Sequence, residues 1–271
     1  MENNYIFWMF RIKEITMKND IDLLYDYLQI LELGLNGKRI LKLCNGRQIL
    51  PKQGVYFFFE PGEIRNNKND LRVVRVGTHG VCMGSKSTLW SRLRAHKGTA
   101  KGFGNHRSSI FRLHIGAALM NKHPELFIET WGKGKSANQE IRSKEIELEQ
   151  KVSEYIRSMP FLYLSIIEEA TSSSDRAYIE RNTIGLLSCL NGNEDMPSMG
   201  WLGLYSKNTN IRESGLWNLD YVKYQYDPDF LDVFKEYVSI TLGKTPNPDK
   251  PLAPPNWKFK INNKSIKILG N

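Results

Sequence analysis

Four residue types in the chain suit phosphate chemistry, and they stand at well-separated positions. Tyr56 follows a glycine and a valine, and a phenol there can bind or activate a water molecule. Arg92 and His96 are four residues apart, so a helix would place both side chains on one face. Arginine grips phosphate oxygens through paired hydrogen bonds, and a carboxylate such as Glu180 can hold a divalent cation.

Glu180 is informative because its neighbours along the expected helix are apolar. It shares a stripe with Ile184 and Leu187, and a carboxylate aligned with such a stripe is costly to bury unless it binds a cation or a partner. Taken singly, each residue also has a structural explanation. Glu180 would be a surface charge beside an arginine, Tyr56 a packing aromatic, and His96 a core or surface histidine.

The elements that must position these residues follow from periodicity and turn signals. Residues 54–59 and 71–76 read as two strands joined by a polar turn, which predicts a hairpin. Ser87 is a plausible N-cap for a helix that reaches His96. A glycine-rich basic loop follows at residues 97–105.

The rest of the chain predicts further helices and one more strand. The helices are expected at residues 20–35, 107–120, 138–159, 175–190 and 229–242, and the strand at residues 161–167. Ser172, Ser173 or Ser174 would cap the helix that carries Glu180. A proline-rich segment at 245–255 leads to a hairpin candidate at 257–269. This order predicts an α+β fold with a small sheet.

The positive charge of the chain is concentrated. Of 271 residues, 25% are charged and the net charge is +9. Between Leu71 and Pro124 there is no Asp or Glu, although this window holds ten Lys and Arg residues and all five histidines. Such a stretch has no counter-ions of its own, which indicates an external polyanion and makes nucleic acid the leading partner. A solvated basic face is the alternative.

The ordered set of motifs resembles the GIY-YIG nuclease family over residues 54–191. It comprises Gly54-Val55-Tyr56 on the first strand, Arg75-Val76-Gly77 on the second, the helical Arg92 and His96, and Glu180 with Asn191 on a later helix. Each motif alone is weak, since Gly-Val-Tyr occurs by chance in many proteins. The order of the set is more specific, and the basic window agrees with it independently.

The resemblance implies a role for each matching residue. Tyr56 would activate water or act as a general base, and Arg92 would bind the scissile phosphate and neutralise its charge. His96 would help to position or deprotonate the water. Glu180 would hold a single Mg²⁺ or Mn²⁺ ion. Asn191 matches an asparagine at the end of the same helix in part of the family.

One motif departs from the family pattern. The second tyrosine of the family falls at Arg75, and the basic residue that often follows the glycine is Thr78 here. Arg75 is either a second phosphate ligand or the mark of altered or lost activity. His79 is close enough to substitute in a polar role. The residues expected to contact DNA are Arg75, His79, Arg94, Lys97, Lys101, His106 and Arg107.

The predicted protein is a cytoplasmic, metal-dependent DNA endonuclease with a three-stranded antiparallel or mixed sheet flanked by helices. We expect a helical N-terminal extension at 1–52, a nuclease domain at 53–193 and a C-terminal extension at 194–271. Three separated cysteines without CxxC spacing argue against structural zinc or disulfides. No stretch is long and apolar enough for a membrane span, and a homodimer is possible. A non-catalytic DNA-binding module and an RNA-directed nuclease remain the alternatives.

Overall fold

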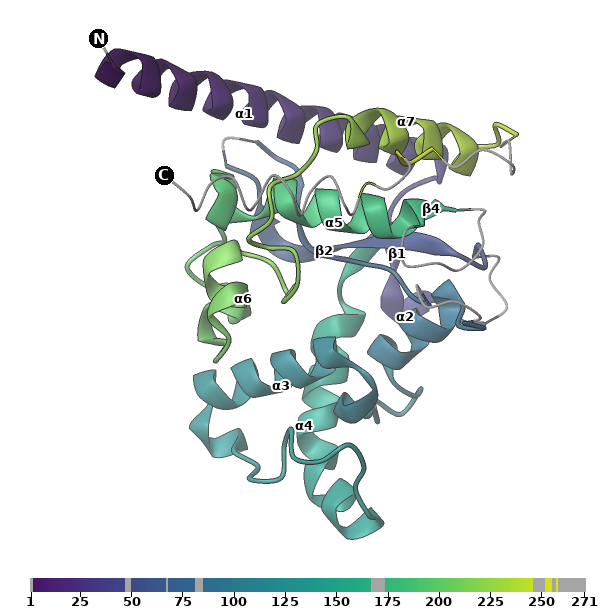
Figure 1. Ribbon diagram of the computed structural model, residues 1–271. Helices are drawn as coiled ribbons and strands as arrows, with labels where there is room; N and C mark the ends of the chain where they lie inside the picture. Colours follow the sequence, from purple (N-terminus) through teal and green to yellow (C-terminus); the bar gives the residue numbers. More distant parts are fainter. Residues whose placement is uncertain are drawn as a thin grey trace.

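The computed structural model describes residues 2–46, 50–66, 68–80, 85–166, 174–245, 252–254 and 257, with side chains from Met17 onward. A sheet lies between two groups of helices in this part of the chain (Figure 1). One face is covered by α1 (Glu2–Gly34), α5 (Asp175–Leu187) and α7 (Phe230–Thr241). The other is covered by α2 (Leu89–Lys97), α3 (Ile110–Lys122) and α4 (Gln139–Arg157). The predicted α+β class is confirmed.

The sheet has four antiparallel strands, where three were expected. Its order is β1 (Arg39–Ile40), β4 (Pro160–Ser165), β2 (Gly54–Ile64) and β3 (Leu71–Gly77). The additional strand is β1, which lies in the stretch expected to be a helical extension. Two residues are too few to show the alternation by which a strand is recognised.

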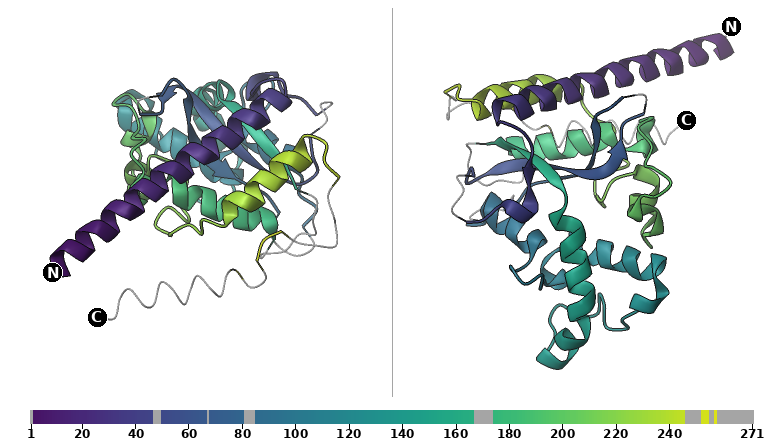
Figure 2. Two further views of the ribbon diagram at one scale, coloured as in Figure 1. Left: turned by 90° about the horizontal axis from the view of Figure 1, so that it is seen from above. Right: turned by 180° about the vertical axis from the view of Figure 1, so that it is seen from behind.

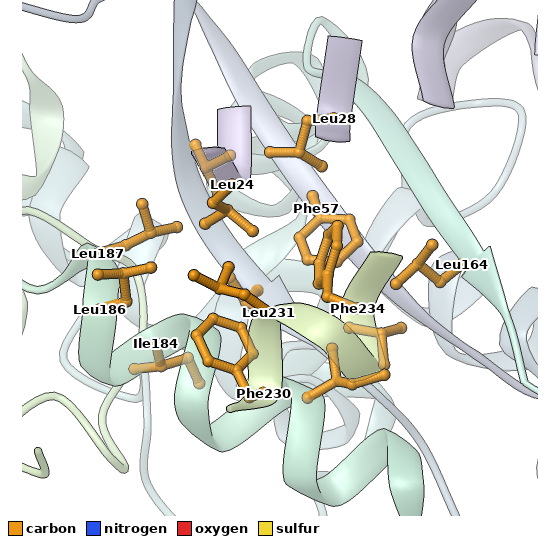
Figure 3. Close-up of a cluster of buried hydrophobic side chains, with 14 of the residues drawn as sticks. Leu24, Leu28, Phe57, Leu164, Ile184, Leu186, Leu187, Phe230, Leu231 and Phe234 are labelled. Atoms are coloured by element: carbon orange, nitrogen blue, oxygen red, sulfur yellow. The ribbon is translucent and has the colours of Figure 1, made fainter. Parts of the chain in front are cut away.

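Successive residues of the central strand β2 point to opposite faces and enter two separate cores. Val55 and Phe57 join the core formed with α1, α5 and α7, and Figure 3 shows Phe57 among the leucines of these helices. Tyr56 and Phe58 join the core formed with α2, α3 and α4. Because both faces are covered, β2 reads as a continuous apolar run.

Helix α1 is longer than the expected helix at 20–35. Its predicted apolar face packs on the sheet through Ile21, Leu24, Leu28 and Leu31. Upstream of this face the helix continues beyond the body of the molecule (Figure 2). The sequence upstream of Gly34 contains no proline or glycine, so no helix-breaking residue limits how far α1 extends toward the N-terminus.

Side-chain caps fix where the helices begin. Thr88, not Ser87, caps α2 and forms a reciprocal capping box with Ser91. Ser109 caps α3, which begins later than expected because residues His106–Ser108 form a separate 3-10 turn, η2. Ser174 caps α5, as one of the three predicted serines. Ser172, Ser173 and residue 167 of the expected strand lie outside the described residues.

The C-terminal region contributes to both cores. After α5 come η4 (Cys189–Asn191), η5 (Leu202–Tyr205) and α6 (Thr209–Ser214), while η1 (Leu41–Leu43) and η3 (Pro124–Leu126) lie earlier in the chain. Trp201 and Trp217 are buried with α3 and α4, and Phe230 and Phe234 are buried with α1 and α5. Most of the proline-rich segment and nearly all of the expected terminal hairpin lie outside the described residues. None of the described helices has the length and hydropathy to cross a membrane.

Candidate active site

The predicted motifs meet at the open end of the β2–β3 hairpin, away from its turn. Tyr56 on β2 lies opposite Gly77 on β3, so the two glycine-containing motifs are cross-strand neighbours. The next residue along, Thr78, donates its backbone N–H to Oε1 of Glu180 over 3.0 Å. Helix α5 thereby brings its carboxylate to the end of the hairpin from the opposite face of the sheet.

Tyr56 and His96 form a buried hydrogen-bonded pair. The Tyr56 hydroxyl is 2.9 Å from Nε2 of His96, and Nδ1 of His96 is 2.8 Å from Oγ of Ser109. Both aromatic side chains are only 1% exposed. Burial, reinforced by the charges of Arg75 and Arg92, holds the pKa of His96 well below its usual range. The imidazole is therefore neutral, so one of its ring nitrogens donates a hydrogen bond and the other accepts one.

Gly77 is required by this arrangement. A Cβ at this position would overlap the phenol of Tyr56, which lies directly over the backbone of β3. The glycine of the second motif thus makes room for the tyrosine of the first. This explains in physical terms why the two motifs occur together.

Glu180 is half-buried and carries the perturbed carboxyl group of the site. Burial raises its pKa to about 7, although the charges of Arg75 and Arg92 and the bond from Thr78 act in the opposite direction. Asp220 adds a smaller raising effect. A carboxyl group with such a pKa gains from a cation placed beside it.

The two arginines near Glu180 are held differently. Arg75 donates through Nη1 to the backbone oxygen of Trp217, and its guanidinium lies 4.7 Å from the centre of the Phe111 ring. Arg92 is half-buried, and within the described residues no hydrogen bond or ion pair occupies its guanidinium. Of these two arginines, Arg92 is therefore the one whose guanidinium is unoccupied within the described residues.

His79 does not lie where a DNA contact would require it. The side chain is buried, and its Nδ1 donates to the backbone oxygen of Ser87 over 3.1 Å. Burial and the charge of Arg176 lower the pKa of His79 to about 4, so the ring carries no charge for a phosphate. Nε2 is buried and has no hydrogen-bond partner among the described residues. The buried, uncharged ring of His79 is therefore not available for the DNA contact that the sequence predicted.

Comparison with known proteins agrees with the family resemblance of the motifs. A family model described as a GIY-YIG domain matches residues 15–243, which is most of the chain. The chain belongs to the GIY-YIG family. No curated protein and no solved structure matches it. The match begins within α1 and ends after α7, so it includes much of what the motifs alone suggested to be extensions.

The residues of the GIY-YIG site fit a single divalent cation. Mg²⁺ is commonly held by one or two carboxylates together with water and substrate phosphates. Glu180 offers one carboxylate whose Oε1 is fixed by Thr78 and whose burial favours a neighbouring positive charge. The described residues contain no group of three or more His, Cys, Asp or Glu side chains that would form an all-protein site. Glu180 is therefore the residue that would hold the ion.

Asn191, expected among the catalytic residues, points into a different environment. Its amide nitrogen donates to the backbone oxygens of Gly185 at 2.7 Å, Tyr224 at 2.9 Å and Val222 at 3.3 Å. It clamps a C-terminal segment onto the end of α5. The described contacts of the Asn191 amide are therefore structural.

Contrary to our expectation, two basic residues of the window between Leu71 and Pro124 have counter-ions within the protein. The Arg107 guanidinium makes paired bonds of 2.6 and 2.8 Å to Glu145, and the buried His106 donates from Nδ1 to Glu149 over 3.0 Å. Both carboxylates come from α4, outside the window. His106 and Arg107 are occupied within the protein and are not presented to phosphates.

The remaining predicted DNA contacts are more accessible. Arg94 and Lys101 are exposed. Lys97 is half-buried and donates from Nζ to the backbone oxygen of Cys44. Burial, and then the nearby charge of Arg157, lowers the pKa of Lys97.

Sequence reasoning missed several neighbours of the site. Ser109 holds Nδ1 of His96, and its only sequence signal was that of a helix cap. Arg176 donates to the backbone oxygen of His79 over 2.8 Å and fixes the loop after β3. Asp220 lies close enough to affect Glu180, although it is 40 positions later in a region without any motif.

Proposed function

We propose that this GIY-YIG protein is a metal-dependent DNA endonuclease that hydrolyses phosphodiester bonds. The observation that carries the proposal is the half-buried carboxyl group of Glu180, bound to the end of β3 and facing the unoccupied guanidinium of Arg92. Nucleases need a group that binds a cation and a group that binds a phosphate at one place. Here both stand beside the buried pair of Tyr56 and His96.

Each side chain has a definite task in the proposed reaction. Arg92 binds oxygens of the scissile phosphate and offsets the charge that builds up during attack. Tyr56 orients the attacking water through its phenol oxygen, while Nε2 of His96 holds the phenol proton. Because the pKa of His96 is far below neutrality, the imidazole fixes this hydrogen bond and does not store a proton. A Mg²⁺ or Mn²⁺ ion at Glu180 would supply Lewis-acid stabilisation of the phosphate.

The assignment of DNA as the substrate rests on charge. The net charge is +9, and Arg94 and Lys101 are exposed cations on α2 and the loop that follows it. We propose that this surface guides the DNA backbone to Arg92. A role in restriction, defence or repair within the cytoplasm is compatible with this chemistry.

Nicking of supercoiled plasmid in Mg²⁺ or Mn²⁺ tests the proposal. We expect cleavage by the wild type, none in EDTA, and losses of at least 100-fold in Arg92→Ala and Glu180→Gln. Binding without cleavage in any metal would support the non-catalytic alternative. Preferred cleavage of an RNA of the same sequence would support the RNA-directed alternative. Sequencing the ends left on a mixed DNA library would then define the cutting preference.

A further inference from the structure

The guanidinium of Arg75 is committed to contacts inside the protein. Its Nη1 donates to the backbone oxygen of Trp217. Its Nε is buried and has no hydrogen-bond partner among the described residues. Arginine grips a phosphate through two adjacent N–H groups. A side-on grip would need the buried Nε, and an end-on grip would have to share Nη1 with Trp217. This geometry disfavours Arg75 as a second phosphate ligand, which is one of the two interpretations that the sequence left open.

Trp217 and Asn218 form a short segment that lies beside the edge strand β3. The backbone N–H of Trp217 donates to the oxygen of Val74 over 2.7 Å. The side-chain amide of Asn218 accepts from the N–H of Val76 at 3.1 Å and donates to the oxygen of Val76 at 2.8 Å. Arg75 lies between these two strand residues, so its bond to Trp217 is a further attachment of the segment to β3.

The ring of Phe111, near the start of α3, contacts both partners of this bond and the imidazole of the site. The Arg75 guanidinium lies over the ring, 4.7 Å from its centre. The Trp217 ring packs against it with 6.2 Å between centres. The imidazole of His96 meets it edge-on, at 5.4 Å and 89°. Phe111 is 1% exposed, and a ring packed so closely cannot shift without moving its neighbours.

The start of α3 also holds His96 by a hydrogen bond. Oγ of Ser109, the N-cap of α3, is 2.8 Å from Nδ1 of His96. The other ring nitrogen, Nε2, is 2.9 Å from the hydroxyl of Tyr56. The orientation of the imidazole toward the phenol therefore depends on where α3 begins. A misplacement of about 1 Å in such a group can cost about 100-fold in rate.

We propose that Arg75 is a positioning residue of the nuclease site, which holds the ring of Phe111 against His96. Through this ring it keeps the imidazole in place to bind the phenol of Tyr56. This inference rests on the proposed function. An arginine suits the position because one planar group can donate to a carbonyl and lie over an aromatic ring at the same time. Trp217 thereby makes the C-terminal region part of the support of the site.

The kinetic test compares Arg75→Gln with Arg212→Gln. Arg212 is also half-buried and donates through Nη1 to a backbone oxygen, that of Ser206, so the control removes the same charge and the same kind of bond. For plasmid nicking, we expect Arg75→Gln to lower kcat at least 10-fold with KM within twofold of the wild type. Arg212→Gln should leave both constants within twofold. A kcat of Arg75→Gln within twofold of the wild type overturns the proposal.

The salt dependence of DNA binding separates positioning from phosphate binding. A positioning residue predicts the same slope of log affinity against log salt concentration in Arg75→Gln and Arg212→Gln. Loss of a phosphate ligand would instead reduce the magnitude of the slope by about 0.9 in Arg75→Gln alone. Such a reduction overturns the proposal.

Nitrogen NMR of the imidazoles gives a measurement that does not depend on cleavage. The ring-nitrogen signals of His96, assigned with His96→Gln, report its two hydrogen bonds in the metal-free protein without DNA. We expect them to shift in Arg75→Gln and to keep their wild-type positions in Arg212→Gln. Unchanged His96 signals in Arg75→Gln overturn the proposal, whatever the kinetics show.

Two further outcomes are covered by the same measurements. If Arg75→Gln does not fold, Arg75→Lys, which keeps the charge but not the planar fork, takes its place under the same criteria. If the wild type cuts no DNA, the proposed nuclease function fails, and the NMR measurement alone decides whether Arg75 positions His96.

Discussion

A buried phenol and a buried imidazole satisfy each other at the centre of the site. Tyr56→Phe removes the hydroxyl 2.9 Å from Nε2 of His96 and leaves that nitrogen buried without a partner. We expect a loss of about 1–3 kcal/mol in the free energy of unfolding together with loss of cleavage. Urea denaturation and plasmid nicking measure the two effects. Tyr205→Phe, at a 40% exposed tyrosine, is the control; equal stability of the two variants would contradict the hydrogen bond.

The Glu180 carboxyl group makes stability depend on pH in a defined direction. Burial raises its pKa from 4.5 to about 7, against the effects of Arg75 and Arg92 and with that of Asp220. The folded state therefore binds the proton more tightly than the unfolded state. The stabilisation is complete below pH 4.5 and is lost as the pH rises to about 7. Thermal melts of metal-free Glu180→Gln should lack this decline; an identical decline in the variant would assign it to another group.

The sequence predicted some residues of the site better than others. Tyr56, Gly77, Arg92, His96 and Glu180 are local signals on strands and helices whose faces follow from spacing, and the structure gathers them at one end of the sheet. The surroundings of His79, Asn191, His106 and Arg107 were not predictable in this way. They depend on side chains and carbonyls that arrive from distant elements, such as Glu145 and Glu149 on α4.

Helix α4 supports the site through the carboxylate of Glu149, which binds Arg112. Arg112 is 0% exposed and donates to Glu149 through Nε over 2.9 Å and to the backbone oxygen of His96 over 2.8 Å. Burial opposes ionisation of Glu149, yet hydrogen bonds from His106 and the charge of Arg112 hold its pKa below the usual range. This contribution is therefore present above pH 4.5 and is lost as the pH falls below it.

Removing this carboxylate tests the helix as a support for catalysis. Glu149→Ala leaves the Arg112 guanidinium buried without its counter-ion, and we expect a loss of about 3–5 kcal/mol. Cleavage should fall as well, because Arg112 also holds the end of α2 at His96. Chemical denaturation measures the first effect. Glu154→Ala, at an exposed position on the same helix, should change little; equal losses in the two variants would exclude a special role for Glu149.

At the level of elements, periodicity predicted the helices and the three longer strands, while their ends moved by a few residues. The exceptions have physical causes. Strand β1 has only two residues, and α1 extends upstream of the face that gives it a recognisable stripe. Trp217 and Asn218 lie beside β3, where the backbone N–H of Trp217 donates to Val74 and the side-chain amide of Asn218 accepts from the N–H of Val76. No local pattern in the sequence predicts such a contact.

Across the described part of the molecule, some arginine and lysine side chains pair with carboxylates inside the protein, and others are exposed to solvent. Arg107 and Arg112 pair with α4, whereas Arg94 and Lys101 are exposed around α2. Helices α1 and α7 lie on the opposite face of the sheet (Figure 2). DNA that reaches Arg92 should therefore meet the α2 face and leave the α1–α7 face free.

Matched charge reversals on the two faces test this orientation. Each phosphate contact contributes about 0.9 to the slope of log affinity against log salt concentration. Arg94→Glu combined with Lys101→Glu should therefore weaken binding to all DNA sequences alike and reduce the magnitude of the slope by about 2. Lys18→Glu combined with Lys235→Glu changes the net charge equally at exposed positions of α1 and α7. Fluorescence anisotropy over a salt series measures both; equal weakening would show that net charge, and not the α2 surface, governs DNA binding.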